Sequence, residues 1–214
     1  MIINKSRSTA LATFAMTREQ IFQELVERSN RSGNAIWLAR MIASWRVGEG
    51  ALPDYLGLSP KQFNNLRSHC FSDIALPHLA VSGKTVDYSR MLEKQDLETL
   101  LADFRAPGVA ESEWIIAILV AGCLGSDHLW QDLGLWSRSE LSGLMSHNFP
   151  ELAARNNKDM KWKKFLYKQL CEMEGLNLCR APSCQVCQDY GLCFASEEST
   201  SVIDQVERNF NLDA

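Results

Sequence analysis

The sequence lacks a long apolar run and an excess of positive charge. Its longest apolar run, residues 114–125 (WIIAILVAGCLG), has twelve residues, whereas a membrane-spanning helix needs about 20. The 22 basic and 26 acidic residues leave a net charge of -4, which does not fit a polybasic nucleic-acid-binding protein. We therefore expect neither membrane nor nucleic-acid binding, and we predict that residues 114–125 form a buried helix.

The common signatures of enzymes are missing as well. The sequence contains no GxGxxG, P-loop, GxSxG or HExxH motif, so it offers neither a glycine-rich phosphate cradle nor a recognisable nucleophile signature. No internal repeat of fixed period is apparent. The motifs thus give no support for a common enzyme class.

The N-terminal residues do not form a convincing secretion signal. Lys5 and Arg7 precede a weak apolar patch, but Ser8, Thr9 and Thr13 interrupt it. In a reducing compartment, clustered cysteines bind metal more often than they form disulfides. The odd total of seven cysteines also fits a disulfide framework poorly. We expect a cytoplasmic protein.

Helix signals dominate what the sequence does contain. Apolar residues recur at spacings of three and four, and capping boxes begin at Thr17, Ser59 and Ser137. Strand-like alternation is scarce. We predict a mainly α-helical fold, a multi-helix single domain with helices at about residues 17–29, 34–47, 60–70, 89–105, 112–124, 127–133, 138–147 and 159–174.

The texture of the sequence changes after Gly175. Pro182 and Gly191 fall among closely spaced cysteines, a composition that a long helix would not tolerate. The last residues carry five acidic side chains against the single Arg208 and lack the apolar density for a core. The predicted parts are a flexible N-terminal arm (1–16), a helical domain (17–175), an irregular cysteine-rich loop (176–195) and an acidic tail (196–214).

Four cysteines, called here the cysteine motif, follow the pattern C-x4-C-x2-C-x5-C at Cys179, Cys184, Cys187 and Cys193. Four thiolates that converge on one point need a cation or a cluster to neutralise them. A compact irregular run suits an iron-sulfur cluster, whose metals occupy separate corners. Structural zinc usually takes two short-spaced pairs of ligands. The spacing favours a cluster, and zinc or unligated thiols stay open as alternatives.

The predicted helix before the cysteine motif reverses the acidic sign of the chain. Residues 155–170 carry six basic residues and one acidic residue. On a helical wheel a lysine stripe lies beside the apolar face, at Lys161, Lys164 and Lys168. A solvated surface is the plain alternative. Close to a thiolate-bound cluster, however, this lysine stripe would attract an incoming oxyanion or an acidic partner.

Two further side chains are candidate additional ligands. Cys171 follows Lys168 by about one helical turn, and a neighbouring ammonium group favours a thiolate. His128 lies close to Asp127 and Asp132 in the stretch SDHLWQDLGL. The structural alternatives are an inert thiol for the first and an ordinary polar helix start for the second.

The stretch DMKWKKFLYKQLCEMEGLNLCRAPSCQVCQDYGLCF, residues 159–194, closely resembles the C-terminal signature of the NifQ family. Residues 128–156 and, more weakly, residues 52–63 also resemble this family. NifQ proteins belong to nitrogen fixation. The resemblance implies a carrier and not an enzyme: one that holds molybdenum in a molybdenum-iron-sulfur cluster and supplies it for assembly of the nitrogenase iron-molybdenum cofactor.

The resemblance also implies ligands and partners. The cysteine motif matches the family's cluster-binding motif without a departure in spacing, so its four cysteines are the implied ligands. The implied partners are the nitrogenase iron protein and the NifEN assembly scaffold, and the implied source is molybdate or sulfur-bound molybdenum. The rival hypotheses are an iron-sulfur electron carrier or redox sensor without molybdenum, a zinc-stabilised helical interaction module, and an enzyme that uses the cluster.

Overall fold

The protein is built from α-helices that surround one buried helix, α5. The computed structural model describes residues 16–71, 82–173 and 193–194. The helices in these ranges are α1 (Arg18–Glu27), α2 (Ala35–Arg46), α3 (Pro60–Cys70), α4 (Lys94–Asp103), α5 (Ser112–Cys123), α6 (Leu129–Asp132), α7 (Arg138–Asn148), α8 (Pro150–Arg155) and α9 (Trp162–Met173), with 3-10 turns η1 (Asp54–Gly57) and η2 (Tyr88–Arg90). The described residues contain no β-strand, only an isolated bridge between Ser29 and Phe71. The predicted mainly α-helical fold is confirmed.

Each predicted helix coincides with an observed one, but two local predictions are wrong. The helix predicted at residues 89–105 is divided, because η2 comes first and α4 begins only at Lys94. The side chain of Asp87 caps η2 by accepting the backbone N–H of Ser89 at 3.0 Å. The sequence did not predict α8, which has six residues and begins at Pro150. So short a helix carries too few apolar positions to show a period.

The three predicted helix starts are correct, and one of them differs in its side-chain bonds. Thr17 and Ser59 form complete capping boxes. Ser137 accepts the backbone N–H of Glu140 at 3.3 Å, but the Glu140 carboxylate accepts the N–H of Trp136 at 2.9 Å and pairs with Arg40. A charged partner therefore draws Glu140 away from the reciprocal bond of a capping box.

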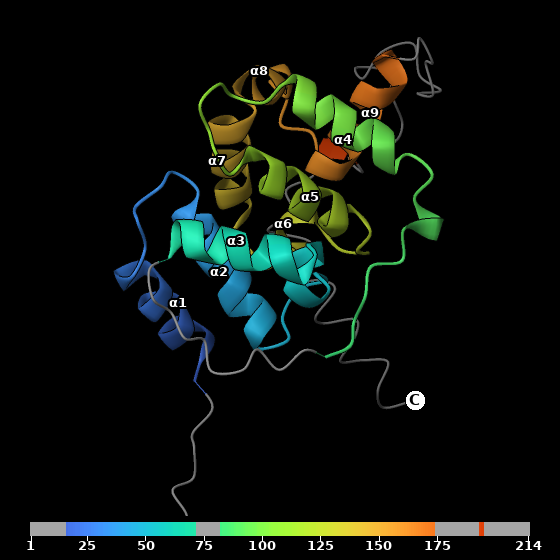
Figure 1. The fold of residues 1–214 in the computed structure, drawn as a ribbon. Coiled ribbons are helices and arrows are strands. Elements are labelled where there is room, and N and C mark those ends of the chain that lie inside the picture. Colours follow the sequence, from blue (N-terminus) through green and yellow to red (C-terminus); the bar gives the residue numbers. More distant parts are fainter. Residues whose placement is uncertain (1–15, 72–81, 174–192, 195–214) are drawn as a thin grey trace, which may run out of the picture.

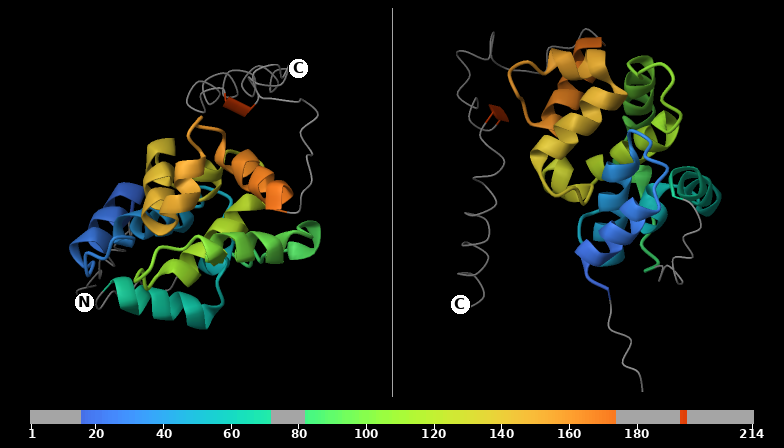
Figure 2. Two further views of the ribbon diagram at one scale, coloured as in Figure 1. Left: turned by 90° about the horizontal axis from the view of Figure 1, so that it is seen from above. Right: turned by 90° about the vertical axis from the view of Figure 1, so that its left-hand side faces the viewer.

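Helix α5 lies between two groups of helices. In Figure 1, α1, α2 and α3 lie on one side of α5, and α4, α8 and α9 lie on the other. The right-hand view of Figure 2 shows the same division. Nine of the twelve residues of α5 are buried, so its continuous apolar sequence has neighbours on nearly every side. The prediction of a buried helix at this run is confirmed.

A pair of buried amides joins α2 to α7. The side chains of Asn34 and Asn148 are fully buried. Each donates to the other, with N···O distances of 2.9 Å and 2.7 Å, and Asn148 also donates to the carbonyl of Leu144 at 2.9 Å. Buried amides are tolerated when their donors and acceptors are satisfied in this way. The pair fixes the end of α7, after which α8 and α9 follow.

A buried ion pair holds α9 against α6. The Lys163 ammonium on α9 binds the carboxylate of Asp132 and donates to the carbonyl of Gly125 at 2.7 Å. Asp132 is only 2% exposed. A Cβ atom at Gly125 would lie 2.2 Å from the carboxyl carbon of Asp132, so glycine is needed at this position. These contacts set both the place and the rotation of α9.

Parts of the predicted domain division lie outside the described residues. These are residues 1–15 of the arm, the whole acidic tail 196–214, and the cysteine-rich loop apart from Cys193 and Phe194. The boundaries of the arm, loop and tail stay predictions. Within the ranges that are described, no helix is long and apolar enough to cross a membrane.

Replacing Lys163 by methionine is expected to lower the free energy of unfolding by about 3 kcal/mol at pH 8, because the carboxylate of Asp132 would be buried without a partner. Burial already raises the pKa of Asp132 above its ordinary value, against the opposing influence of Lys163. Without Lys163 the pKa should rise further. The folded state then binds the proton more tightly than the unfolded state, so stability is present at low pH and is lost as pH rises.

Urea unfolding of the variant and the parent at pH 5 and pH 8 measures the free energy of unfolding. The loss in stability of Lys163→Met relative to the parent should be larger at pH 8 than at pH 5. The double variant Lys163→Met/Asp132→Asn serves as the control, because it removes the titrating carboxylate together with its partner. A Lys163→Met protein as stable as the parent at pH 8 would show that the ion pair does not hold α9.

Candidate metal centre

Cys193, the last cysteine of the motif, lies against the beginning of α9. Its carbonyl oxygen accepts the backbone N–H of Lys161 at 2.9 Å. Cys193 and Phe194 are half-buried and pack against the hydrophobic core. One of the four predicted ligands is therefore fixed to the helical body, beside the residue at which the lysine stripe begins.

A lysine side chain approaches the thiol of Cys193. The Nζ atom of Lys164 lies 3.7 Å from the Sγ atom of Cys193, within the range of an N–H···S contact. Lys164 is exposed on α9. The geometry therefore gives this sulfur both a fixed place and a neighbouring positive charge.

The other three cysteines of the motif, Cys179, Cys184 and Cys187, lie outside the described residues. Convergence of the four sulfur atoms therefore stays a prediction. Soft thiolate donors such as Cys193 suit zinc, copper(I) and iron-sulfur clusters. Cys193, with the ammonium of Lys164 beside its sulfur, can therefore supply one of the four sulfur ligands of such a site.

The three residues of the lysine stripe have different surroundings, although the prediction from sequence gave all of them the same role. Lys164 contacts the thiol of Cys193. Lys168 is paired with Glu172, with 3.1 Å between Nζ and Oε1. Lys161 holds Cys193 through its backbone N–H. The structure thus brings Lys161 and Lys164 to Cys193, the one cysteine of the motif that it describes, and pairs Lys168 with Glu172.

Sequence reasoning missed the structural role of Lys163. On a helical wheel Lys163 lies about 20° from Leu170, at the edge of the apolar face, and this position was a signal that its side chain turns inward. Its side chain is 20% exposed and its ammonium is paired with Asp132. Because α9 is fixed by Lys163, the neighbouring Lys164 faces outward toward Cys193.

The two candidate additional ligands do not belong to a metal site within the described part of the chain. No three side chains of His, Cys, Asp or Glu in that part gather closely enough to hold a metal ion. Cys171 is half-exposed on α9. His128 starts α6, and its backbone N–H donates to the side chain of Gln131 at 3.2 Å. Neighbouring Asp132 is committed to Lys163, so Cys171 and His128 are candidates on sequence grounds alone.

The buried cysteines Cys70 and Cys123 are poor metal ligands. Burial raises the pKa of each thiol to about 12. The nearby carboxylate of Glu111 also raises the pKa of Cys70, and Lys163 only partly opposes the effect of burial at Cys123. Near neutral pH both are neutral thiols inside the core, and metals bind the thiolate. They provide natural controls for experiments on the cysteine motif.

The region of this chain that matches the model of a known protein family includes the cysteine motif. The sequence model of the NifQ family matches residues 37–195, which cover α3 to α9 and all four cysteines. Protein NifQ of Azotobacter vinelandii is 42% identical over 174 residues, which are 77% of this chain and 89% of that protein.

Two further relatives are similar over comparable lengths. Protein NifQ of Rhodobacter capsulatus is 36% identical, over 75% of this chain and 87% of its own length. Protein NifQ of Klebsiella pneumoniae is also 36% identical, over 74% of this chain and 96% of its own length. No solved structure matches the chain. The family model and these relatives show that the chain belongs to the NifQ family of nitrogen-fixation proteins.

Proposed function

We propose that this protein carries molybdenum within a molybdenum-iron-sulfur cluster and delivers it for assembly of the nitrogenase iron-molybdenum cofactor. Membership of the NifQ family supports this role. The structural observation that carries the proposal is the placement of Cys193, whose carbonyl is bound by Lys161 and whose sulfur lies 3.7 Å from the ammonium of Lys164. We assign the cluster, as cargo, to the four cysteines of the motif.

The chemistry of the proposed ligands fits such a cargo. Thiolates and sulfide bind iron well, and a sulfur-rich cluster can hold molybdenum out of its oxyanion state. Four thiolates around a cluster carry considerable negative charge, and Lys164 offsets part of it next to Cys193. The protein is proposed to bind and release the cluster and not to catalyse a reaction. The NifQ family is not a known enzyme family.

The proposed partners follow from the same role. Molybdenum enters as molybdate or from a sulfur-bound source, and the nitrogenase iron protein and the NifEN scaffold receive it. A thiolate-bound cluster needs a reducing environment, so we place the protein in the cytoplasm. The exposed Lys164 beside Cys193 offers an acidic partner a point of attraction at the site of transfer.

Replacing Cys184 and Cys187 by alanine is expected to lower bound iron, sulfide and molybdenum about tenfold or more, because the cluster loses half of its protein ligands. The measurement is metal and sulfide analysis, with an absorption spectrum, on protein isolated anaerobically from cells supplied with molybdate. The matched control is Cys70→Ala, which removes a buried neutral thiol and should leave the cluster in place.

Other compositions would contradict the proposal. Iron and sulfide without molybdenum would favour an electron carrier or redox sensor, and zinc without sulfide would favour a structural zinc module. Cysteine variants that keep the full cluster would remove the motif as its binding site.

Replacing Lys164 by glutamine is expected to slow cluster loading about three- to tenfold at low ionic strength and to flatten its dependence on salt, because the charge beside Cys193 is lost. Stopped-flow absorption during reconstitution measures the rate. Lys168→Gln is the comparison on the same helix. Its effect should be smaller, because Glu172 already compensates this ammonium. Equal rates for Lys164→Gln and the parent protein at every salt concentration would remove Lys164 from the proposal.

A further inference from the structure

The segment between α8 and α9 ends in a left-handed turn, immediately before the residue that binds Cys193. Asp159 has a backbone φ of 56°, in a region that residues other than glycine adopt rarely, although aspartate tolerates it better than most. Such a conformation persists only when the contacts around it determine it. The contacts that hold Asp159 therefore also fix the direction in which the chain reaches Lys161.

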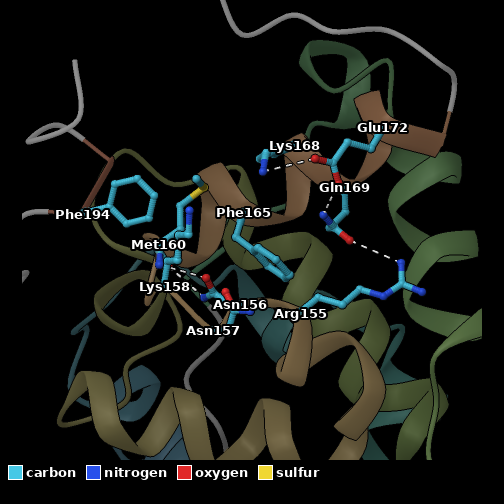
Figure 3. Close-up of a pocket in the computed structure, with 10 residues that line it drawn as sticks. All are labelled: Arg155, Asn156, Asn157, Lys158, Met160, Phe165, Lys168, Gln169, Glu172 and Phe194. Carbon is cyan, nitrogen blue, oxygen red and sulfur yellow. Dashed lines mark hydrogen bonds and ion pairs between the residues drawn. The ribbon is translucent and has the colours of Figure 1, made fainter. Parts of the chain in front are cut away.

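Asn156 closes one side of this turn. Its side-chain oxygen accepts the backbone N–H of Met160 at 2.8 Å, and its amide donates to the carbonyl of Met160 at 2.9 Å. The backbone carbonyl of Asn156 accepts the N–H of Asp159 at 3.0 Å. Figure 3 shows the bonds between Asn156 and Met160 as dashed lines and draws the ring of Phe194 beside Met160. Phe194 directly follows Cys193 in the chain, so the closed turn lies beside the described end of the cysteine motif.

Arg138, the first residue of α7, holds the other side of the turn. Its Nη1 atom lies 2.5 Å from the carboxylate of Asp159, and its Nη2 atom donates to the carbonyls of Asp159 at 3.2 Å and Met160 at 3.4 Å. The side chain of Arg138 is only 15% exposed, whereas that of Asp159 is 74% exposed. A planar guanidinium can bind several oxygens of one segment at once. Arg138 therefore fixes both the side chain and the carbonyl of the left-handed residue.

Helix α7 also holds the chain on the far side of Lys161. The hydroxyl of Ser142, about one helical turn after Arg138, accepts the indole N–H of Trp162 at 3.2 Å. Trp162 is buried and is the first residue of α9. The residues that come before and after Lys161 are thus both bonded to α7.

Lys161 has one backbone group that is not used by α9. Its carbonyl accepts the N–H of Phe165 at 2.9 Å, and its own N–H donates to the carbonyl of Cys193 at 2.9 Å. The N–H groups at the start of a helix have no partner within the helix, so this donor can hold another segment. Because the neighbours of Lys161 are fixed by α7, the direction of the donor is fixed as well.

We infer that Arg138 is a positioning residue for Cys193. It holds the left-handed turn at Asp159, and this turn directs the N–H of Lys161 at the carbonyl of Cys193. The inference rests on the proposed function, in which Cys193 is a ligand of the cluster. A ligand that the surrounding contacts already hold in place loses less conformational freedom when it binds metal, so these contacts strengthen binding.

Hydrogen exchange of single backbone amides, followed by NMR on the full-length, reduced, metal-free protein, tests the inference. In Arg138→Gln the amide of Lys161 should exchange about tenfold faster than in the parent, because its bond to Cys193 opens more often. The amide of Phe165, which bonds within α9, should change by less than about twofold. A general loss of stability would instead raise both rates together. Arg105→Gln, which removes an exposed guanidinium after α4, should leave both rates unchanged.

Two substitutions at Asp159 isolate the contribution of the backbone conformation. Asp159→Gly and Asp159→Ala both remove the carboxylate, but glycine adopts a positive φ readily and alanine does not. Asp159→Ala should speed exchange at Lys161 about three- to tenfold, and Asp159→Gly should stay within about twofold of the parent. Equal exchange in these two variants would overturn the inference. So would exchange in Arg138→Gln that is unchanged, or that rises equally at Lys161 and Phe165.

Loss of the cluster to an iron chelator measures the consequence for the ligand. Followed by absorption in anaerobically isolated protein, this loss should be about three- to tenfold faster in Arg138→Gln than in the parent, and equal rates would count against the inference. Metal and sulfide analysis separates the two proposals. Protein that contains the molybdenum cluster but shows unchanged exchange at Lys161 refutes positioning by Arg138 alone. Selective exchange at Lys161 in protein without molybdenum refutes the carrier alone.

Discussion

The buried ion pair between Lys163 and Asp132 sets the geometry on which the candidate centre depends. It fixes α9 in rotation, because the ammonium is bound both by the carboxylate of Asp132 and by the carbonyl of Gly125. Successive residues on a helix differ by about 100° in direction. Once Lys163 points inward, Lys164 points out toward Cys193. The inward-facing ammonium of Lys163 therefore determines the direction in which the side chain of Lys164 points.

The basic residues around α9 have different partners and therefore different roles. Lys163 stabilises the fold, Lys164 lies at the thiol of Cys193, and Lys168 is compensated by Glu172. Arg155 and Lys158 precede the helix. The local excess of positive charge thus includes one ammonium that stabilises the fold and one that lies next to sulfur, and separate substitutions can test the two.

Much of the fold could be predicted from the sequence, because helix caps and apolar periods are local properties. The starts at Thr17, Ser59 and Ser137 are examples. Contacts between distant residues could not be predicted in this way. Glu140 pairs with Arg40, 100 residues away, instead of forming the expected capping bond. Lys163 pairs with Asp132, 31 residues earlier in the chain. The cysteine motif was visible as a pattern, whereas the docking of Cys193 on α9 depends on three-dimensional packing.

The docking of Cys193 gives the cysteine motif the character of a chelating loop. The chain leaves α9 at Met173 and is bound again at the beginning of the same helix, through Lys161. These two points are separated by about 18 Å, the length of a twelve-residue helix. Both ends of the intervening segment are therefore anchored to one rigid element, which limits the entropy that ring closure around a metal can cost. Because both ends are anchored, the length of the chain itself limits how far Cys179, Cys184 and Cys187 can lie from Cys193.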